Sequence, residues 1–277
     1  MKKYIPICVL VVVFVALKYA NTTDTDDTPI EQVVTEQTSA EPTDLVYPDL
    51  LEQPVLGCDD NIINHTGFTL SYNDKTNCPN WVAWQLTAEE VATLAAQRSN
   101  DFRGDPEVAR SHRVETYDYK NSGYDRGHMC PAADMKWDAT AMSDCFYMSN
   151  ICPQEPTLNQ RWWEHVESAC RRWAEREGCV YVCCGPLYKK SVRVRYIGQQ
   201  VRVRVPDGFF KVVLSLRRGA EKAIGFIYSN TEERQTMADA ASAVDEVEAL
   251  TGYDFFAQVP DTLESRLEQT YNLTDWD

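Results

Sequence analysis

Short apolar runs separated by polar residues and glycines give the first outline of the fold. Most of them are rich in valine, isoleucine and aromatic residues, a composition that is typical of β-strands. The strands predicted in this way span residues 68–72, 81–86, 124–129, 146–149, 180–184, 209–216 and 223–228. Because predicted strands outnumber predicted helices, we expect an α+β fold with a mixed or antiparallel central sheet flanked by helices.

Helical patterns are fewer. They are predicted over residues 87–97, 158–177, 237–250 and 260–268. Thr87 and Glu90 have the spacing of a capping box, in which each side chain binds the backbone N–H of the other residue. Gly178 follows the second pattern and predicts its end, since glycine readily adopts the conformation found after helices. Residues 98–123 are predicted to be mainly loop.

Residues 191–196 and 201–205 alternate valine with arginine and face each other across residues 197–200. This arrangement predicts a β-hairpin with arginines on its polar faces. The arginines are Arg193, Arg195, Arg202 and Arg204. They form either a solvated sheet face or a surface that contacts phosphates, and the pattern favours the first at least as much as the second.

The first residues resemble an export signal. A pair of lysines precedes an apolar run over residues 4–17, which is shorter than the roughly 20 residues of a membrane-spanning helix. Cleavage after Ala20 would place Lys18 where a small residue is preferred, so a cleaved signal peptide and an uncleaved signal anchor both stay open. We expect residues 1–20 to direct export, with the protein periplasmic, extracellular or tethered to a membrane through this segment.

Residues 21–47 are rich in Thr, Asp, Glu and Gln and nearly lack aromatic residues. Such a composition buries too little apolar surface to fold, so this segment is predicted to be a flexible linker. Over residues 48–277 we find no second linker and no repeat, and we expect a single domain there.

The chain has 10 cysteines, which together with an export signal favour an oxidising compartment and disulfides. Cys8 lies inside the apolar run. The others are odd in number, so at least one would be free or bonded elsewhere, and the sequence does not indicate which cysteines pair.

The formal net charge of -15 argues against a polyanionic substrate, but the charge is unevenly distributed. Residues 98–218 carry 20 basic and 15 acidic side chains, whereas residues 219–277 carry 3 basic and 13 acidic ones. An anionic partner responds to the local field, so the central segment permits a nucleic-acid substrate without demonstrating one.

The segment richest in chemistry spans residues 124–134 and reads YDRGHMCPAAD. A histidine such as His128 can take a proton from water near neutral pH. Arg126 supplies a fixed positive charge suited to phosphate oxygens. Gly127 allows a close approach to the backbone, and Asp125 could orient a neighbouring donor. A single histidine is usually structural. The polar residues around His128 in this segment are what favours a catalytic role.

A second polar segment begins with Asn159, at the start of a predicted helix. Asn159 is either a helix cap or a neutral oxygen ligand for Mg²⁺, which keeps several waters and needs few protein ligands. Glu167 lies two turns further along and could hold such an ion through water. An ordinary helix salt bridge between Glu167 and Arg171 is the alternative.

The order of these motifs resembles the DNA/RNA non-specific endonuclease family. These are the ββα-metal, or His-Me finger, nucleases, which include secreted bacterial nucleases and mitochondrial endonuclease G. The matching strings are Asp-Arg-Gly-His at 125–128, Ser-Asn-x-x-Pro-Gln at 149–154 and Asn…Trp…Glu at 159–167. Further similar strings lie at 79–87, 205–212 and 251–256, so the resemblance covers roughly residues 72–268. Arg-Gly-His alone would be a weak signal, but the ordered set is specific.

The resemblance implies a Mg²⁺-dependent endonuclease that hydrolyses phosphodiester bonds of DNA and RNA to 5′-phosphate products. His128 would be the general base, Asn159 the direct ligand of one Mg²⁺, and Glu167 a ligand through water. Mn²⁺ is expected to substitute for Mg²⁺.

Arginines supply most of the other roles that the resemblance implies. Arg126 and Arg171 would contact the phosphate or steady the site. The family also uses a loop arginine to stabilise the transition state, and Arg98 is favoured over Arg103 for this role. The remaining candidates for substrate contacts are Asn150, Arg103 and Arg161. Phe146 stands where some members carry a polar residue, which puts substrate contacts there in doubt.

Two other classes of function compete with this interpretation. A secreted or tethered binding module could keep the fold and lose catalysis, but the base, the metal ligand and the arginines are all present. A zinc protein is suggested by the cysteine and histidine content. No pair of Cys-x2-Cys motifs occurs, however, and the adjacent Cys183 and Cys184 better suit a disulfide or the core.

Overall fold

The computed structural model describes residues 51–55, 61–190 and 193–277. The predicted export signal over residues 1–20 and the predicted linker over residues 21–47 lie outside these described residues. Within the described part, none of the helices combines the length and the apolar character that crossing a membrane requires.

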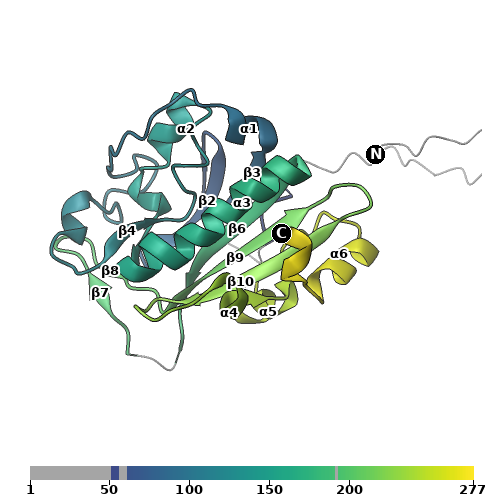
Figure 1. The fold of residues 1–277 in the computed structure, drawn as a ribbon. Helices are drawn as coiled ribbons and strands as arrows, with labels where there is room; N and C mark the ends of the chain where they lie inside the picture. The colour runs from purple at the N-terminus through teal and green to yellow at the C-terminus, as the bar shows by residue number, and fades with distance from the viewer. Residues whose placement is uncertain (1–50, 56–60, 191–192) are drawn as a thin grey trace, which may run out of the picture. The chain divides into compact units, whose positions relative to one another are not determined.

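A seven-stranded sheet in the order β1-β2-β3-β6-β9-β10-β11 forms the centre of the fold (Figure 1). Every neighbouring pair of strands in it is antiparallel. The strands are β1 (Asn61–His65), β2 (Phe68–Asn73), β3 (Cys78–Thr87), β6 (Cys179–Leu187), β9 (Gly208–Ser215), β10 (Lys222–Ser229) and β11 (Ala241–Ser242). The predicted α+β class with an antiparallel central sheet is therefore confirmed.

The sheet is buried on both faces because alternate residues of its strands enter two separate cores. On β3, Val82 and Trp84 join one core, while Trp81 and Ala83 join the other. All eight residues of β9 are buried as a result. Successive side chains of a strand point to opposite faces, so the period of two in the sequence maps directly onto the two cores.

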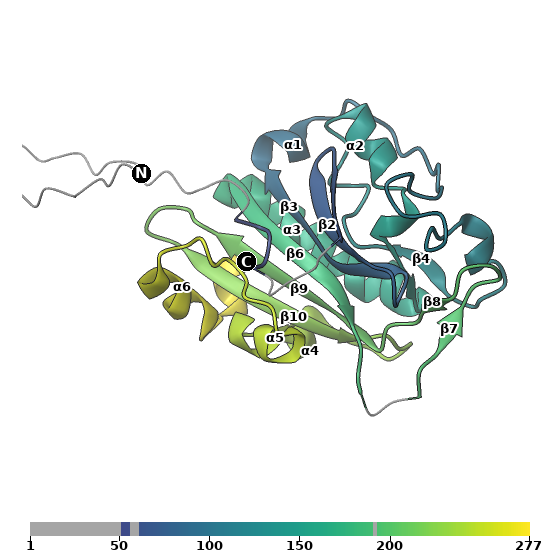
Figure 2. The same ribbon diagram turned by 180° about the vertical axis from the view of Figure 1, so that it is seen from behind.

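Helices cover the two faces. α3 (Glu164–Glu177) lies across the first face, where Val166 and Trp173 enter the larger core (Figure 1). α5 (Val244–Thr251) and α6 (Asp261–Glu268) contribute Val247 and Leu267 to the smaller core (Figure 2). Gly178 ends α3 at φ 87°, as the sequence predicts.

A second, two-stranded sheet carries the motif that the sequence singles out. β4 (Asp125–His128) pairs antiparallel with β5 (Ile151–Gln154), with Gly127 opposite Cys152. A π-helical turn, η3 (Leu158–Trp163), follows β5 and leads directly into α3. The paired strands β4 and β5 and the helix after them make up a ββα unit, and residues 129–150 connect the two strands.

The remaining elements are short. They are α1 (Ala88–Ala92), η1 (Thr116–Tyr119), α2 (Ala139–Asp144), η2 (Met148–Asn150), β7 (Tyr196–Ile197), β8 (Val203–Arg204), α4 (Met237–Ala240) and η4 (Leu273–Trp276). The capping box between Thr87 and Glu90 is present at α1. The helix ends at Ala92 rather than near residue 97, since none of its residues is buried and packing does not stabilise further turns.

Two predicted elements are wrong. Residues 146–149 are not a strand: Phe146 and Tyr147 donate backbone hydrogen bonds to Ser143 and Asp144 in a tight turn. The strand comes next, as β5. It contains Pro153, which lacks an N–H group and argues against a central strand but is compatible with a two-stranded pair.

The helix predicted over residues 237–250 is broken. Ala241 and Ser242 leave the helical path and pair with Phe226 and Gly225 at the edge of the sheet. A side chain on Gly225 would meet Ser242 Oγ at 2.8 Å, so the missing side chain allows this approach. Among its described residues the hairpin is also shorter than predicted, because β7 and β8 pair residues 196–197 with 203–204 and one further backbone hydrogen bond joins Val205 to Arg195.

The cysteines that the structure describes correct the expectation of disulfides. All eight carry free thiols: Cys78, Cys130, Cys145, Cys152, Cys170, Cys179, Cys183 and Cys184. Cys183 and Cys184 enter the two different cores, as neighbours on a strand must. Cys8 and Cys58 lie outside the described residues.

Gly127 gives a direct test of the packing between β4 and β5. A Cβ atom on Gly127 would lie 2.1 Å from Gln154 Oε1 and 2.6 Å from Gln154 Cβ, and Gln154 is fully buried. Gly127→Ala should therefore lower the free energy of unfolding by about 1–3 kcal/mol, as overpacking does.

Urea denaturation of Gly127→Ala, Gln154→Gly and the double variant would check this expectation, because glycine also removes the Cβ atom of residue 154. Removing the Gln154 side chain should make room for the added methyl group, so the double variant should be more stable than the sum of the two single effects implies. Strictly additive effects would contradict a clash between these two residues.

Candidate active site

A cleft of about 680 Å³ opens beside the ββα unit. It is lined by Arg98, Asn100, Phe102, Thr116, Tyr117, Tyr119, Lys120, Tyr124, Asp125, Arg126 and Asn159. Three basic side chains face one acidic side chain in this set, and several tyrosines offer ring faces. Such a lining suits an extended anion whose groups can also stack on aromatic rings.

His128 lies at the end of β4, beneath the cleft. Its side chain packs against two aromatic rings, with ring centroids 5.2 Å from Phe102 and 4.9 Å from Phe146. The residue is 8% exposed, and its Nε2 atom is buried without a hydrogen-bond partner. A buried polar atom left unpaired in this way costs free energy and is typical of functional sites.

The surroundings of His128 keep its ring uncharged. Burial, followed by the positive charges of Arg98 and Arg126, lowers the pKa of His128 to about 3. The imidazole is therefore neutral at physiological pH and can accept a proton.

Asp125 fixes the orientation of the Asn159 amide. Asn159 Nδ2 donates a hydrogen bond of 2.9 Å to Asp125 Oδ2, and Gln160 Nε2 donates one of 2.8 Å to the same oxygen. Because the nitrogen end of the amide is held by Asp125, its oxygen is directed elsewhere. An amide oxygen at a polar cleft is a donor that Mg²⁺ accepts, so this side chain fits the predicted ion.

Glu167 is half-buried on α3, and Lys211 of β9 lies near it. Burial raises the pKa of Glu167 to about 7, although the nearby positive charge of Lys211 acts in the opposite direction. Lys211 is fully buried, with its Nζ 5.0 Å and 4.5 Å from the ring centroids of Trp84 and Trp163. A buried ammonium over two indole faces supplies a fixed positive charge beneath α3. Lys211 stands in an apolar strand, so the sequence alone does not reveal it as a residue of the site.

Arg98 and Arg103 occupy different environments. Arg98 lines the cleft, and its guanidinium lies 5.0 Å from the centroid of the Phe146 ring. Arg103 forms an ion pair of 2.9 Å with Asp101, and its guanidinium lies 3.9 Å from the centroid of Tyr147. Geometry therefore favours Arg98 as the loop arginine and gives Arg103 contacts within the protein instead of a substrate contact.

The other arginines differ in their access to the cleft. Arg126 is exposed there, with its guanidinium 4.1 Å from the centroid of the Phe102 ring. Arg171 forms an ion pair of 2.8 Å with the buried Asp134 and so holds α3 against the loop that follows β4. Arg161 is exposed on η3 but does not line the cleft.

Asn150 is fully buried and cannot reach a substrate. Its side chain accepts a hydrogen bond from the backbone of Cys130 and donates to the carbonyls of Cys130 and Cys145, each at 2.9 Å. The substrate contact expected for Asn150 does not fit this geometry. The residue instead ties the end of β4 to the start of β5.

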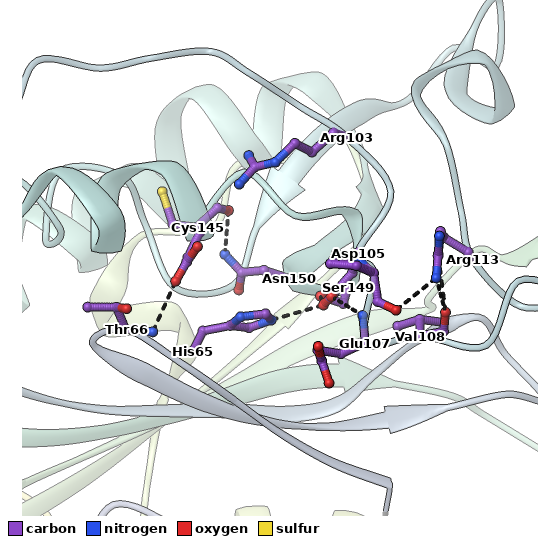
Figure 3. Close-up of polar contacts among 12 residues, drawn as sticks. His65, Thr66, Arg103, Asp105, Glu107, Val108, Arg113, Cys145, Ser149 and Asn150 are labelled. Atoms are coloured by element: carbon purple, nitrogen blue, oxygen red, sulfur yellow. Dashed lines mark hydrogen bonds and ion pairs between the residues drawn. The ribbon is translucent and has the colours of Figure 1, made fainter.

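A network that the sequence does not reveal supports this connection between β4 and β5 (Figure 3). His65 Nε2 lies 2.9 Å from Asp105 Oδ2, and the hydroxyl of Ser149 donates to the same oxygen. Burial raises the pKa of Asp105, but hydrogen bonds from His65 and Ser149 outweigh it and leave the pKa below its usual value. The three residue types are those of a serine hydrolase, yet Asp105 stands between the other two. Histidine cannot activate serine in this order, so the network is structural.

The arginines of the hairpin mostly contact tyrosines. Arg195 donates a hydrogen bond of 2.8 Å to the hydroxyl of Tyr124, a residue of the cleft. The Arg202 guanidinium lies over the ring of Tyr196 and that of Arg204 over the ring of Tyr188. Through Arg195 the hairpin adds positive charge to the rim of the cleft.

The sequence and the fold both match known proteins. A family model described as DNA/RNA non-specific endonuclease matches residues 49–262. The mitochondrial nuclease of Saccharomyces cerevisiae is 34% identical over 228 residues, which are 76% of this chain and 69% of that protein. Mitochondrial endonuclease G of Homo sapiens is 38% identical over 162 residues, 56% of this chain and 54% of the relative. The match therefore spans about half the length of the human protein.

Among solved structures, a chain in the crystal structure of the EndoG/EndoGI complex superposes with a TM-score of 0.69. It is 30% identical in sequence, and the match covers 78% of this chain and 91% of that one.

The comparisons correct the predicted location. The relatives from Homo sapiens, Saccharomyces cerevisiae and Schizosaccharomyces pombe are named as mitochondrial nucleases. The expectation of an exported protein, whether periplasmic, extracellular or membrane-anchored, is therefore wrong. An apolar run after two lysines is a short and unspecific signal, which explains the error.

The lowered pKa of His128 predicts a measurable effect on stability. Between pH 6.5 and pH 3 the unfolded chain binds a proton at this histidine and the folded chain does not, so wild type loses stability as the pH falls through that window. His128→Asn removes this penalty. Between pH 7.5 and pH 5.0 the stability difference should shift in favour of the variant by about 2 kcal/mol.

Urea denaturation of both proteins at the two pH values would measure the shift, because the other titrating groups are common to both and cancel. An unchanged difference would show that His128 titrates normally in the folded protein.

Proposed function

The chain belongs to the DNA/RNA non-specific endonuclease family, and we propose that it hydrolyses phosphodiester bonds of DNA and RNA to 5′-phosphate products with the help of Mg²⁺. As a member of this family it is a hydrolase that acts on nucleic acids. The observation that carries the finer proposal is a neutral histidine beneath a cleft where Arg98, Arg126 and Asn159 converge.

His128 acts as the general base. A ring nitrogen of its neutral imidazole takes a proton from the water that attacks phosphorus. Phe102 and Phe146 hold the ring from two sides, so its position does not depend on the substrate. Because water attacks, and not a ribose 2′-hydroxyl, the reaction does not distinguish DNA from RNA.

Arg98 and Arg126 bind the phosphate that is cut. Their charges face the cleft beside the base and suit the oxygens that gain negative charge in the transition state. Arg171 acts indirectly, because its ion pair with Asp134 holds α3 in place. Contacts to phosphates carry no sequence information, which accounts for a lack of sequence preference.

Asn159 and Glu167 are the residues that would hold Mg²⁺, Asn159 directly and Glu167 through water. When bound, the ion supplies positive charge to the phosphate oxygens and the leaving group. Asp125 keeps the amide oxygen of Asn159 free for this purpose by binding its nitrogen. Mn²⁺, which accepts the same oxygen ligands, should substitute.

We also propose that the protein works in mitochondria. The support for this location is the set of mitochondrial nucleases among its relatives.

Removal of the base or of the metal ligand should abolish cutting. His128→Ala should lower the rate of plasmid and RNA degradation by about 10²–10⁴-fold, which is the usual contribution of a positioned general base. We expect Asn159→Ala, which removes the metal ligand, to lower the rate by a similar factor. EDTA should stop the wild-type reaction, and Mg²⁺ or Mn²⁺ should restore it.

His165→Ala is a matched control, since His165 is exposed on α3 and does not line the cleft. Circular dichroism would verify that the variants fold. Undiminished cutting by His128→Ala would end this mechanism, and a wild type that binds nucleic acid but never cuts it would favour a binding module.

Binding should depend steeply on salt. Duplex DNA that contacts Arg98, Lys120 and Arg126 releases about 0.9 counterion per neutralised phosphate, so log Kd should rise against log[NaCl] with a slope of about 3. Fluorescence anisotropy with the inactive His128→Ala protein in EDTA would measure it. Arg126→Gln should lower the slope by about 1, and a flat profile would exclude phosphate-driven binding.

A further inference from the structure

α5 and α6 lie on the face of the sheet opposite α3 (Figures 1 and 2). A group of carboxylates gathers where these two helices meet. Asp245 and Glu248 are three residues apart on α5, and Glu264 and Glu268 are four apart on α6. Each pair therefore lies on one side of its helix. One carboxylate oxygen from each of Asp245, Glu248 and Glu268 lies within 4.8 Å of the other two.

Glu268 distinguishes this group from an ordinary acidic surface. It is 6% exposed, and its Oε1 atom is buried without a hydrogen-bond partner. Oε1 of Glu264 is also buried and unpartnered. Carboxylate oxygens are strong acceptors, and burying one without a donor is costly. The carboxylate of Glu268 instead faces those of Asp245 and Glu248.

The charges that act most strongly on Glu268 are negative. Burial, followed by the charges of Glu248 and Glu264, raises the pKa of Glu268 to about 8. Burial and the charge of Asp254 likewise raise the pKa of Glu264 to about 7. Carboxylates held this close repel one another unless a proton or a cation stands between them.

We propose that Asp245, Glu248 and Glu268 form a binding site for Ca²⁺. Ca²⁺ takes about six to eight oxygen ligands in flexible geometry, including carboxylates in one- or two-oxygen contact, whereas Mg²⁺ requires a stricter octahedron. Glu248 is already held in place, since its Oε1 accepts a 2.8 Å hydrogen bond from the backbone of Phe255. The ion would join α5 to α6 and remove the repulsion between them. Glu264 adds negative charge beside the site.

This site is separate from the Mg²⁺ site proposed for catalysis. Asn159 lies at the cleft on the side of α3, and the carboxylates lie on the other face of the sheet. The proposal therefore stands or falls independently of the nuclease mechanism.

Calorimetric titration of CaCl₂ into the full chain with Asn159→Ala would test it at pH 9, where Glu268 is ionised, because this background lacks the proposed ligand at the cleft. One Ca²⁺ should bind per chain. Adding Glu268→Gln should weaken binding at least tenfold, whereas Glu246→Gln should not change it. Glu246 is the matched control, since it is exposed on α5 and removes the same charge from outside the group.

The melting temperature gives a second measure of calcium binding. Here the parent keeps Asn159, and Glu268→Gln is its only substitution, so any ion bound at the cleft affects both proteins equally. In EDTA at pH 9, where Glu268 is ionised, Glu268→Gln should melt higher than its parent, because one repulsive charge is gone. With CaCl₂ at about a hundredfold excess over Kd, the parent should gain about 5 °C more than Glu268→Gln, and the order should reverse. The proposal is overturned if the Asn159→Ala protein binds no Ca²⁺, if Glu268→Gln binds it equally well, or if calcium stabilises both proteins to the same extent.

Discussion

The hydrogen bonds of the Asn150 side chain hold together the backbone on which the rest of the site depends. They join Cys130, two residues beyond His128, to Cys145 and to the start of β5. Each of these buried backbone groups would otherwise lack a partner, at a cost of about 1–3 kcal/mol. Ser149 anchors the same turn from the other side through Asp105. The position of the histidine is thus fixed by buried polar contacts that never meet the substrate.

The burial of His128 couples binding to base strength under the proposed mechanism. Arg98 and Arg126 lower the pKa of its ring, and the same two arginines face the cleft. A phosphate bound between them would offset part of their charge. The proton affinity of the imidazole would then rise only when substrate is present. An otherwise weak base therefore gains strength in the complex, while the free protein keeps the ring neutral and ready.

The sequence predicts best those features that are set by local chemistry. The capping box at Thr87 and the helix stop at Gly178 depend on neighbouring residues, and both are present. The break at Ala241 depends on Gly225, a residue of another strand that leaves room for the chain, so a helical pattern cannot reveal it. The same holds for Lys211. Its role follows from two tryptophans that fold over it, and in the sequence it is one cation in an apolar run.

In the candidate site, too, some features follow from the local sequence and others only from the fold. Asp-Arg-Gly-His identifies the residues, but only the fold distinguishes Arg98 in the cleft from Arg103 in its ion pair. The charge of the whole chain likewise does not reveal the charge at the cleft, which depends on the fold. Screening limits a charge to about 8 Å at physiological ionic strength, so the net charge of -15 does not set the field at the cleft. The acidic α5 and α6 lie across the sheet from the basic cleft. A chain can therefore stay strongly acidic overall, which opposes self-association, and still present positive charge where a polyanion must bind.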